Sequence, residues 1–110
     1  MLQLLTELNK LFKQTQLWGT TSHAKLHLQN YPHTAARSYV SVIGFSITEL
    51  VWYNISYQLP AHKRPWPNAQ VIGEAESLNK AIDYLLIAMR ESEGWLENNE
   101  LKKLLAERSL

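Results

Sequence analysis

The first third of the chain changes from a helical to a strand-like spacing of hydrophobic residues. At the N-terminus, apolar positions recur every three or four residues with polar residues between them, which predicts an amphipathic helix. These positions are Leu4, Leu5, Leu8, Leu11 and Phe12. Either Gly19 or the loop just before it should end this helix. In residues 23–30, HAKLHLQN, apolar and polar residues alternate, which predicts a half-buried strand. Pro32 then indicates a turn, because proline cannot donate to a strand ladder.

The middle of the chain, residues 39–59, predicts a β-hairpin. Residues 50–59 alternate between two sets of side chains, and Tyr53, Ile55, Tyr57 and Leu59 form the more apolar set. We therefore expect strands at about 39–45 and 50–59, joined near residues 46–49. A helix over 39–50 is the alternative, since its apolar positions also fit a helical stripe, but the segment is rich in β-branched and aromatic residues.

The C-terminal part predicts one more strand and two helices. The stretch AQVIGEA, residues 69–75, has the composition of a short strand, and Ser77 is a suitable N-cap for a helix over about 78–92. Gly94 is expected to stop that helix. Asn98 or Asn99 could then cap a last short helix, which carries Leu101, Leu104 and Leu105.

The order of these elements predicts the fold class α+β. An N-terminal helix precedes a three- to four-stranded antiparallel sheet, and two C-terminal helices should pack on one sheet face. Amphipathic helices and one-sided strands each have a single face to bury, so we expect residues 1–110 to form a single domain. The other sheet face is left for water or a partner.

Composition narrows the chemistry that is available. The chain is 45% hydrophobic and 19% charged, which allows a real core. It has no cysteine, which excludes disulfides, thiolate zinc sites and cysteine nucleophiles. Six Lys and Arg against two acids give the first 70 residues a charge of +4, whereas five against eight give residues 71–110 a charge of −3. The total of +1 provides no general attraction to polyanions.

The N-terminus and the longest apolar stretch both indicate a cytoplasmic protein. The sequence MLQLLTELNK lacks a basic leader, and Thr6 and Glu7 interrupt its apolar run, unlike a secretion signal. Residues 39–59 are long enough to span a membrane, but Glu49 lies near their centre, where a carboxylate is costly. We therefore expect no membrane association.

Candidate groups for metal binding or catalysis are few. On a strand, His23 and His27 would lie about 13 Å apart, too far to share one metal ion, so we predict no metal site and no cofactor. Glu49, the lone charge in an apolar region, could act as a general acid if it were buried beside Tyr53 or Tyr57. Since no motif with a known chemistry accompanies it, an enzyme or a small-molecule pocket is the third hypothesis, and we expect no catalytic residues.

Nucleic-acid binding is the second hypothesis. Lysine and arginine beside a tryptophan can contact phosphate and stack on bases. The residues concerned are Lys25, Arg37, Lys63, Arg64 and Trp66. The order of elements is similar to that of double-stranded-RNA-binding domains, but those domains carry a lysine cluster at the start of the final helix. This chain has Glu74 and Glu76 there, an acidic helix start that suits the helix dipole and repels phosphate.

Protein binding is the hypothesis that we favour. Trp52 falls on the polar face of its strand, and an aromatic residue among small polar ones is typical of recognition surfaces. Trp66, between Pro65 and Pro67, is either presented to a partner or folded over the core. We predict a small non-enzymatic binding or regulatory protein that recognises a protein partner or a copy of itself, as accessory proteins of bacteria and mobile elements often do. The predicted binding residues are Trp52, Asn54, Ser56, Gln58, Lys63, Arg64 and Trp66.

Overall fold

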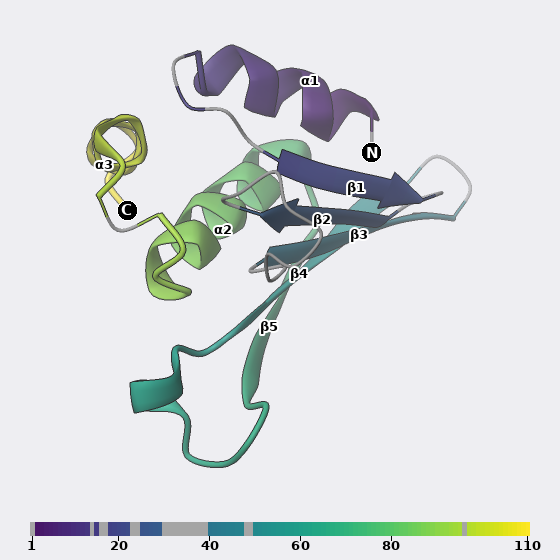
Figure 1. Cartoon of the computed structure of the whole chain (residues 1–110). Coiled ribbons are helices and arrows are strands. Elements are labelled where there is room, and N and C mark those ends of the chain that lie inside the picture. Colours follow the sequence, from purple (N-terminus) through teal and green to yellow (C-terminus); the bar gives the residue numbers. More distant parts are fainter. Residues whose placement is uncertain are drawn as a thin grey trace.

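The computed structural model describes residues 2–13, 15, 18–22, 25–29, 40–47, 50–95 and 97–110, which form three helices and a sheet (Figure 1). The α+β class predicted from the sequence is confirmed. In chain order the elements are α1 (Leu2–Leu11), β1 (Trp18–Ser22), β2 (Lys25–Gln29), β3 (Val40–Ile47), β4 (Leu50–Gln58), the 3-10 turn η1 (Ala61–Lys63), β5 (Gln70–Ala75), α2 (Leu78–Glu91) and α3 (Asn99–Glu107).

The sheet is an antiparallel meander with the strand order β1-β2-β3-β4-β5. The predicted hairpin is confirmed, since β3 and β4 pair from Val40 opposite Tyr57 to Ile47 opposite Leu50. The described chain also has a strand that the sequence analysis did not predict. Gly19 lies in that strand, β1, and α1 already ends at Leu11, so the loop ends the helix and the glycine does not.

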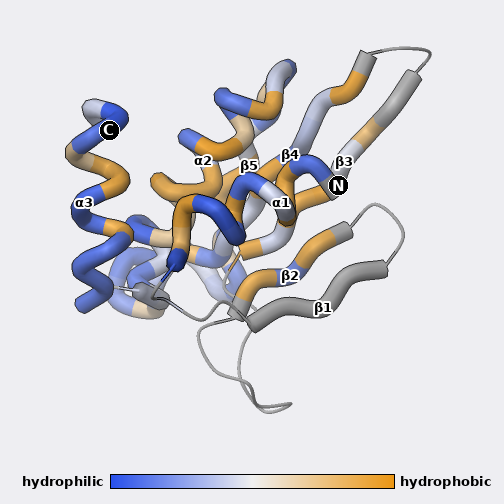
Figure 2. The backbone as a smooth tube through the Cα atoms, turned by 90° about the horizontal axis from the view of Figure 1, so that it is seen from above, coloured by the Kyte–Doolittle hydropathy of each residue, from blue (hydrophilic) through white to orange (hydrophobic). Residues whose placement is uncertain are grey.

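The core lies between one face of the sheet and the helices. Helix α2 packs on β3, β4 and β5, and α1 and α3 pack against α2. The tube in Figure 2 alternates between apolar and polar colours along α3, as expected for a helix with one buried side. The predicted apolar positions of the helices and of β2 are largely buried, among them Leu8, Leu26, Leu85, Met89 and Leu101. The described elements leave the opposite face of the sheet uncovered.

The ends of α2 and α3 agree with the predicted caps except at one position. The Ser77 hydroxyl accepts a hydrogen bond from the Lys80 backbone N–H, and the Asn98 side chain accepts one from that of Leu101 at 2.8 Å. The prediction that Gly94 stops α2 was wrong. The helix ends at Glu91, and Glu93 takes the left-handed conformation with φ 63°, while its N–H donates to the Arg90 carbonyl.

Polar contacts connect α3 to the segment that follows α1 and to α2. The Glu100 carboxylate accepts hydrogen bonds from the backbone N–H groups of Lys13 and Thr15 at 3.0 and 2.9 Å. At the other end of α3, the Arg108 guanidinium donates to Asp83 on α2. These contacts hold α3 against α2 and against the segment that follows α1, on the helical side of the sheet.

No described helix combines the length and the apolar character that a membrane crossing requires.

Candidate protein-binding surface and two surface cavities

The uncovered sheet face carries a mixture of aromatic, aliphatic and polar side chains. Because side chains alternate along a strand, the face follows directly from the buried positions of β3, β4 and β5 and their register. Its members are Ser41, Ile43, Phe45, Trp52, Asn54, Ser56, Gln58, Gln70, Ile72 and Glu74. We call this set the open face. The placement of Trp52, Asn54, Ser56 and Gln58 on one face, away from the core, agrees with the sequence analysis.

Two aromatic rings on the open face stack across neighbouring strands. Phe45 of β3 lies opposite Trp52 of β4, with ring centroids 6.4 Å apart and an angle of 30° between the ring planes. Phe45 remains 38% exposed and Trp52 is partly exposed. A stacked pair that keeps surface in water is a preformed apolar contact for a partner, because little side-chain freedom remains to be lost on binding.

A cavity of about 430 Å³ lies beside Trp52, where β5 has ended and β4 continues toward the hairpin tip. Val51 and Trp52 line it from β4, and Glu74 and Glu76 line it from the end of β5. One wall is therefore aromatic and the other carries two carboxylates. We call this the Trp52 pocket.

The two glutamates of this pocket come from the end of β5 and from the residue before the N-cap of α2. Glu74 lies within β5, in agreement with the strand predicted over 69–75, and Glu76 precedes Ser77. The first turn of α2 holds no acidic residue, so the two glutamates do not form the acidic helix start that the sequence analysis expects. Both side chains are exposed. The sequence pattern alone does not predict that these glutamates lie near Trp52, because their proximity depends on the register between β4 and β5.

The connection between β4 and β5 holds the other predicted binding residues. Trp66 is 67% exposed, so it does not fold over the core. Lys63 makes an ion pair with Glu93 at 3.5 Å, and His62 lies 3.4 Å from the same carboxylate. The Arg64 guanidinium donates to the Leu59 carbonyl at 2.6 Å.

The structure therefore separates the predicted surface into two parts. Lys63 reaches toward Glu93, just beyond the end of α2 and thus on the helical side, whereas Trp52 lies on the open face near the other end of the sheet. Figure 1 shows this connection extending away from the β3–β4 hairpin tip. Gln58 lies six residue steps along β4 from Trp52, a distance of about 20 Å. A partner that contacts Trp52 need not touch Trp66.

The residues of the nucleic-acid hypothesis are not assembled into a basic patch among those that the structure describes. Lys63 and Arg64 have partners within the chain. Lys25 lies in β2, whose register places it opposite Ile43, and Arg37 lies outside the described residues.

The residues of the catalytic and metal hypotheses are only partly described. Glu49 and His23 lie outside the described residues. Burial raises the pKa of the Tyr53 phenol. Burial also raises the pKa of the Tyr57 phenol. The negative charge of Glu91 raises this pKa further, and the positive charge of Arg90 lowers it. A tyrosine phenol is already protonated at neutral pH, and these two shifts favour the protonated form further. Within the described ranges, no three His, Asp or Glu side chains gather as a metal site would require.

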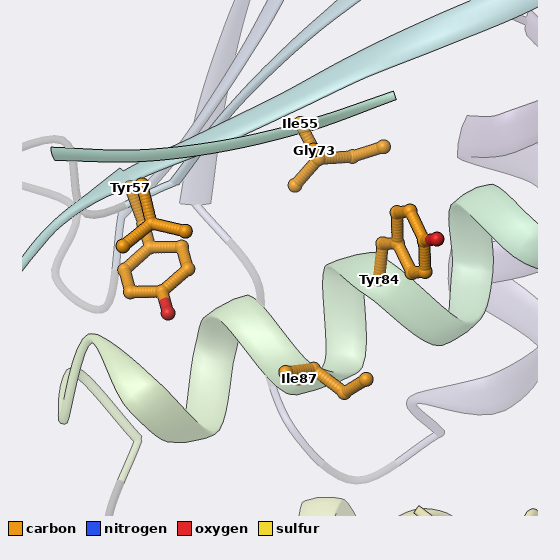
Figure 3. A pocket seen from close by; sticks show the side chains of 6 residues that line it. Ile55, Tyr57, Gly73, Tyr84 and Ile87 are labelled. Atoms are coloured by element: carbon orange, nitrogen blue, oxygen red, sulfur yellow. The ribbon is translucent and has the colours of Figure 1, made fainter. Parts of the chain in front are cut away.

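A second, apolar cavity of about 220 Å³ opens between the sheet edge and α2 (Figure 3). It is lined by Ile55, Tyr57, Val71, Gly73, Tyr84 and Ile87. A Cβ atom placed on Gly73 would come within 3.3 Å of the Tyr84 ring, so the glycine permits the close approach of helix and strand. We call this the edge pocket. The sequence analysis did not predict it, because its walls come from three elements.

Comparison with known proteins gave no matching family model and no significantly similar curated protein or solved structure. The function is therefore inferred from the site itself.

Proposed function

We propose that this chain is a small non-enzymatic binding protein whose open face recognises a protein partner through a lysine or arginine side chain. The Trp52 pocket carries this proposal. It brings Trp52 together with Glu74 and Glu76 in the lining of one cavity.

The chemistry of the pocket suits a cationic side chain of a protein. An ammonium or guanidinium group is attracted to the face of an indole ring, by about 0.5 to 2 kcal/mol according to its solvation. Two carboxylates beside the ring add charge-assisted hydrogen bonds. The aliphatic stem of the same lysine or arginine would lie along Val51, which is 44% exposed.

The rest of the open face suits a polypeptide as well. The Phe45–Trp52 stack and Ile72 offer apolar area to a partner. Asn54 and Ser56 lie between these apolar groups and offer hydrogen-bonding groups. Aromatic anchors surrounded by polar side chains are typical of protein interfaces.

Nucleic acid, the second candidate, fits this site less well. Glu74 and Glu76 would repel phosphate at the point where the aromatic surface is largest. The loop with Trp66 remains the site for this alternative, but its Lys63 is already paired with Glu93.

The proposal predicts that neutralising the pocket weakens the binding of a cationic peptide. Fluorescence anisotropy would follow a labelled oligo-arginine peptide titrated with the protein at low salt. The double variant Glu74→Gln, Glu76→Gln should raise the Kd about three- to tenfold, because each lost contact with a charged group is worth a few tenths to 1 kcal/mol.

A matched variant separates the pocket from general charge effects. Glu97→Gln with Glu107→Gln removes two exposed carboxylates from the C-terminal region and should leave the Kd within about twofold of the native value. Equal weakening by both double variants would show that the peptide follows net charge only. Tighter binding of single-stranded oligo-thymidine than of oligo-arginine would favour the nucleic-acid alternative.

A further inference from the structure

Among the strands that the structure describes, none pairs with the outer edge of β5. The Leu59 N–H donates to the Ala69 carbonyl at 3.1 Å, in line with the β4–β5 register that pairs Gln58 with Gln70. Backbone groups of a strand point to its two sides alternately, so Val71 and Gly73 also bond to β4. The N–H and C=O groups of Gln70, Ile72 and Glu74 consequently point outward, and β5 is the last strand of the described sheet.

This edge has few of the features with which proteins usually prevent strand pairing, and Glu74 is its one charged residue. Between Gln70 and Ala75 there is neither a proline nor a lysine, and the strand runs without interruption. Ile72 is 67% exposed and Val71 39% exposed. The edge pocket lies directly beside the strand, so apolar surface continues from Ile72 on the open face, past Val71, to Tyr84 and Ile87 of α2.

We propose that a second copy of this chain pairs along β5, antiparallel, about a twofold axis at Ile72. The outward groups of Ile72 would then exchange two hydrogen bonds with those of Ile72 in the second copy. Gln70 would face Glu74 of the second copy, and Glu74 would face its Gln70. A parallel arrangement would instead place Glu74 beside its own copy, a like-charge contact that the antiparallel one avoids.

In this register, the Val71 side chain of the second copy would enter the edge pocket. Val71 of one copy lies opposite Gly73 of the other, in the closer type of antiparallel pair, with Cα atoms about 4.5 Å apart. The Tyr84 ring already covers Gly73, so the incoming valine would lie beside the glycine and against the edge of that ring. By symmetry each copy fills the pocket of the other.

The charges on α2 are arranged for the same symmetry. Lys80, Tyr84, Ile87 and Glu91 follow one another at the spacing of a single helix face. Gly73 lies against Tyr84, and Tyr57, which pairs with Val71, lies close enough to Glu91 to interact with its charge. Ile72 is therefore level with the stretch between Tyr84 and Ile87.

A twofold axis at that level runs the two α2 helices antiparallel on the same side of the joined sheet. Lys80 of each copy then faces Glu91 of the other, and Tyr84 faces Ile87. Opposite charges flank an apolar centre at both ends of the contact, and this self-complementarity is the reason to name a second copy as the occupant of the edge. The inference does not depend on the identity of the partner of the open face, although Ile72 and Glu74 belong both to that face and to the edge of β5.

Disulfide trapping tests the register, because the chain has no cysteine of its own. In the proposed dimer the two Cα atoms of residue 72 lie about 5.5 Å apart, within the range for a disulfide. The variant Ile72→Cys should therefore form a cross-linked dimer under mild oxidation, read on a non-reducing gel. The matched variant Glu74→Cys, on the same strand and face, should remain without a cross-link and run as a monomer on the same gel, because its two copies lie about 13 Å apart along the paired strands.

Cross-linking of both variants to the same extent, or of neither, would overturn the proposed pairing.

A charge exchange provides an independent test, with the mass followed by light scattering. Lys80→Glu or Glu91→Lys alone should raise the dimer dissociation constant several-fold, and the two together should restore it. A native chain that remains at 12.7 kDa up to about 1 mM, or a double variant no better than the singles, would also overturn the proposal.

Discussion

Replacing Leu85 by alanine should lower the free energy of unfolding by about 2 to 5 kcal/mol. Leu85 is fully buried on α2, the helix that contacts the sheet, α1 and α3. Truncation removes apolar contacts and leaves a cavity that the surrounding elements cannot close completely. Because domains of this size are stable by only about 5 to 15 kcal/mol, this is a large part of the total. Urea unfolding followed by far-UV circular dichroism measures it.

An exposed position on the neighbouring helix provides the control for Leu85. Lys102→Ala changes a side chain in water on α3, and its effect should stay within about 0.5 kcal/mol. A loss below about 1 kcal/mol for Leu85→Ala would contradict the placement of α2 against the sheet.

Replacing Trp52 by alanine should weaken binding of the oligo-arginine peptide at least tenfold. The indole supplies one wall of the Trp52 pocket and half of the stack with Phe45, and the loss of an aromatic anchor costs about 2 kcal/mol or more in many interfaces. Stability should fall much less than for Leu85→Ala, because the ring is already partly in water. Anisotropy titration and urea unfolding of the same preparation measure both effects.

Trp66→Ala is the matched variant, since it removes the same side chain from the exposed loop between β4 and β5. We expect it to change neither the Kd of the peptide nor the free energy of unfolding beyond about 0.5 kcal/mol. If Trp52→Ala lowered stability by several kcal/mol while the Kd remained unchanged, Trp52 would be a core residue and the proposed surface would be wrong.

The elements with a clear hydrophobic period were predictable from the sequence. The alternation around Tyr53 and Ile55 indicated β4 with one buried face, and Ser77 and Asn98 were recognised as caps because their hydrogen bonds are local. β1 was missed because WGTTS contains no apolar alternation. It is a strand through its pairing with β2, which no local pattern encodes.

The site was only partly predictable, for the same reason. Trp52 could be placed on the open face from alternation alone. Its stack with Phe45 and its position beside Glu74 and Glu76 depend on the register of three strands. The cationic loop was predicted to join the same surface, but Lys63 finds Glu93 at the end of α2 instead. The orientation of the Lys63 side chain thus depends on an ion pair with a residue that is distant in the sequence.

The most direct test of a cation-binding site at Trp52 is the set of indole N–H resonances in a ¹⁵N-labelled sample. The chain has four tryptophans, and single replacements by phenylalanine assign their signals. Titration with oligo-arginine should shift the Trp52 indole signal, while the signal of Trp66 in the loop and that of the buried Trp95 stay in place. A shift of Trp66 without one of Trp52, or no shift of either, would contradict the proposed binding surface.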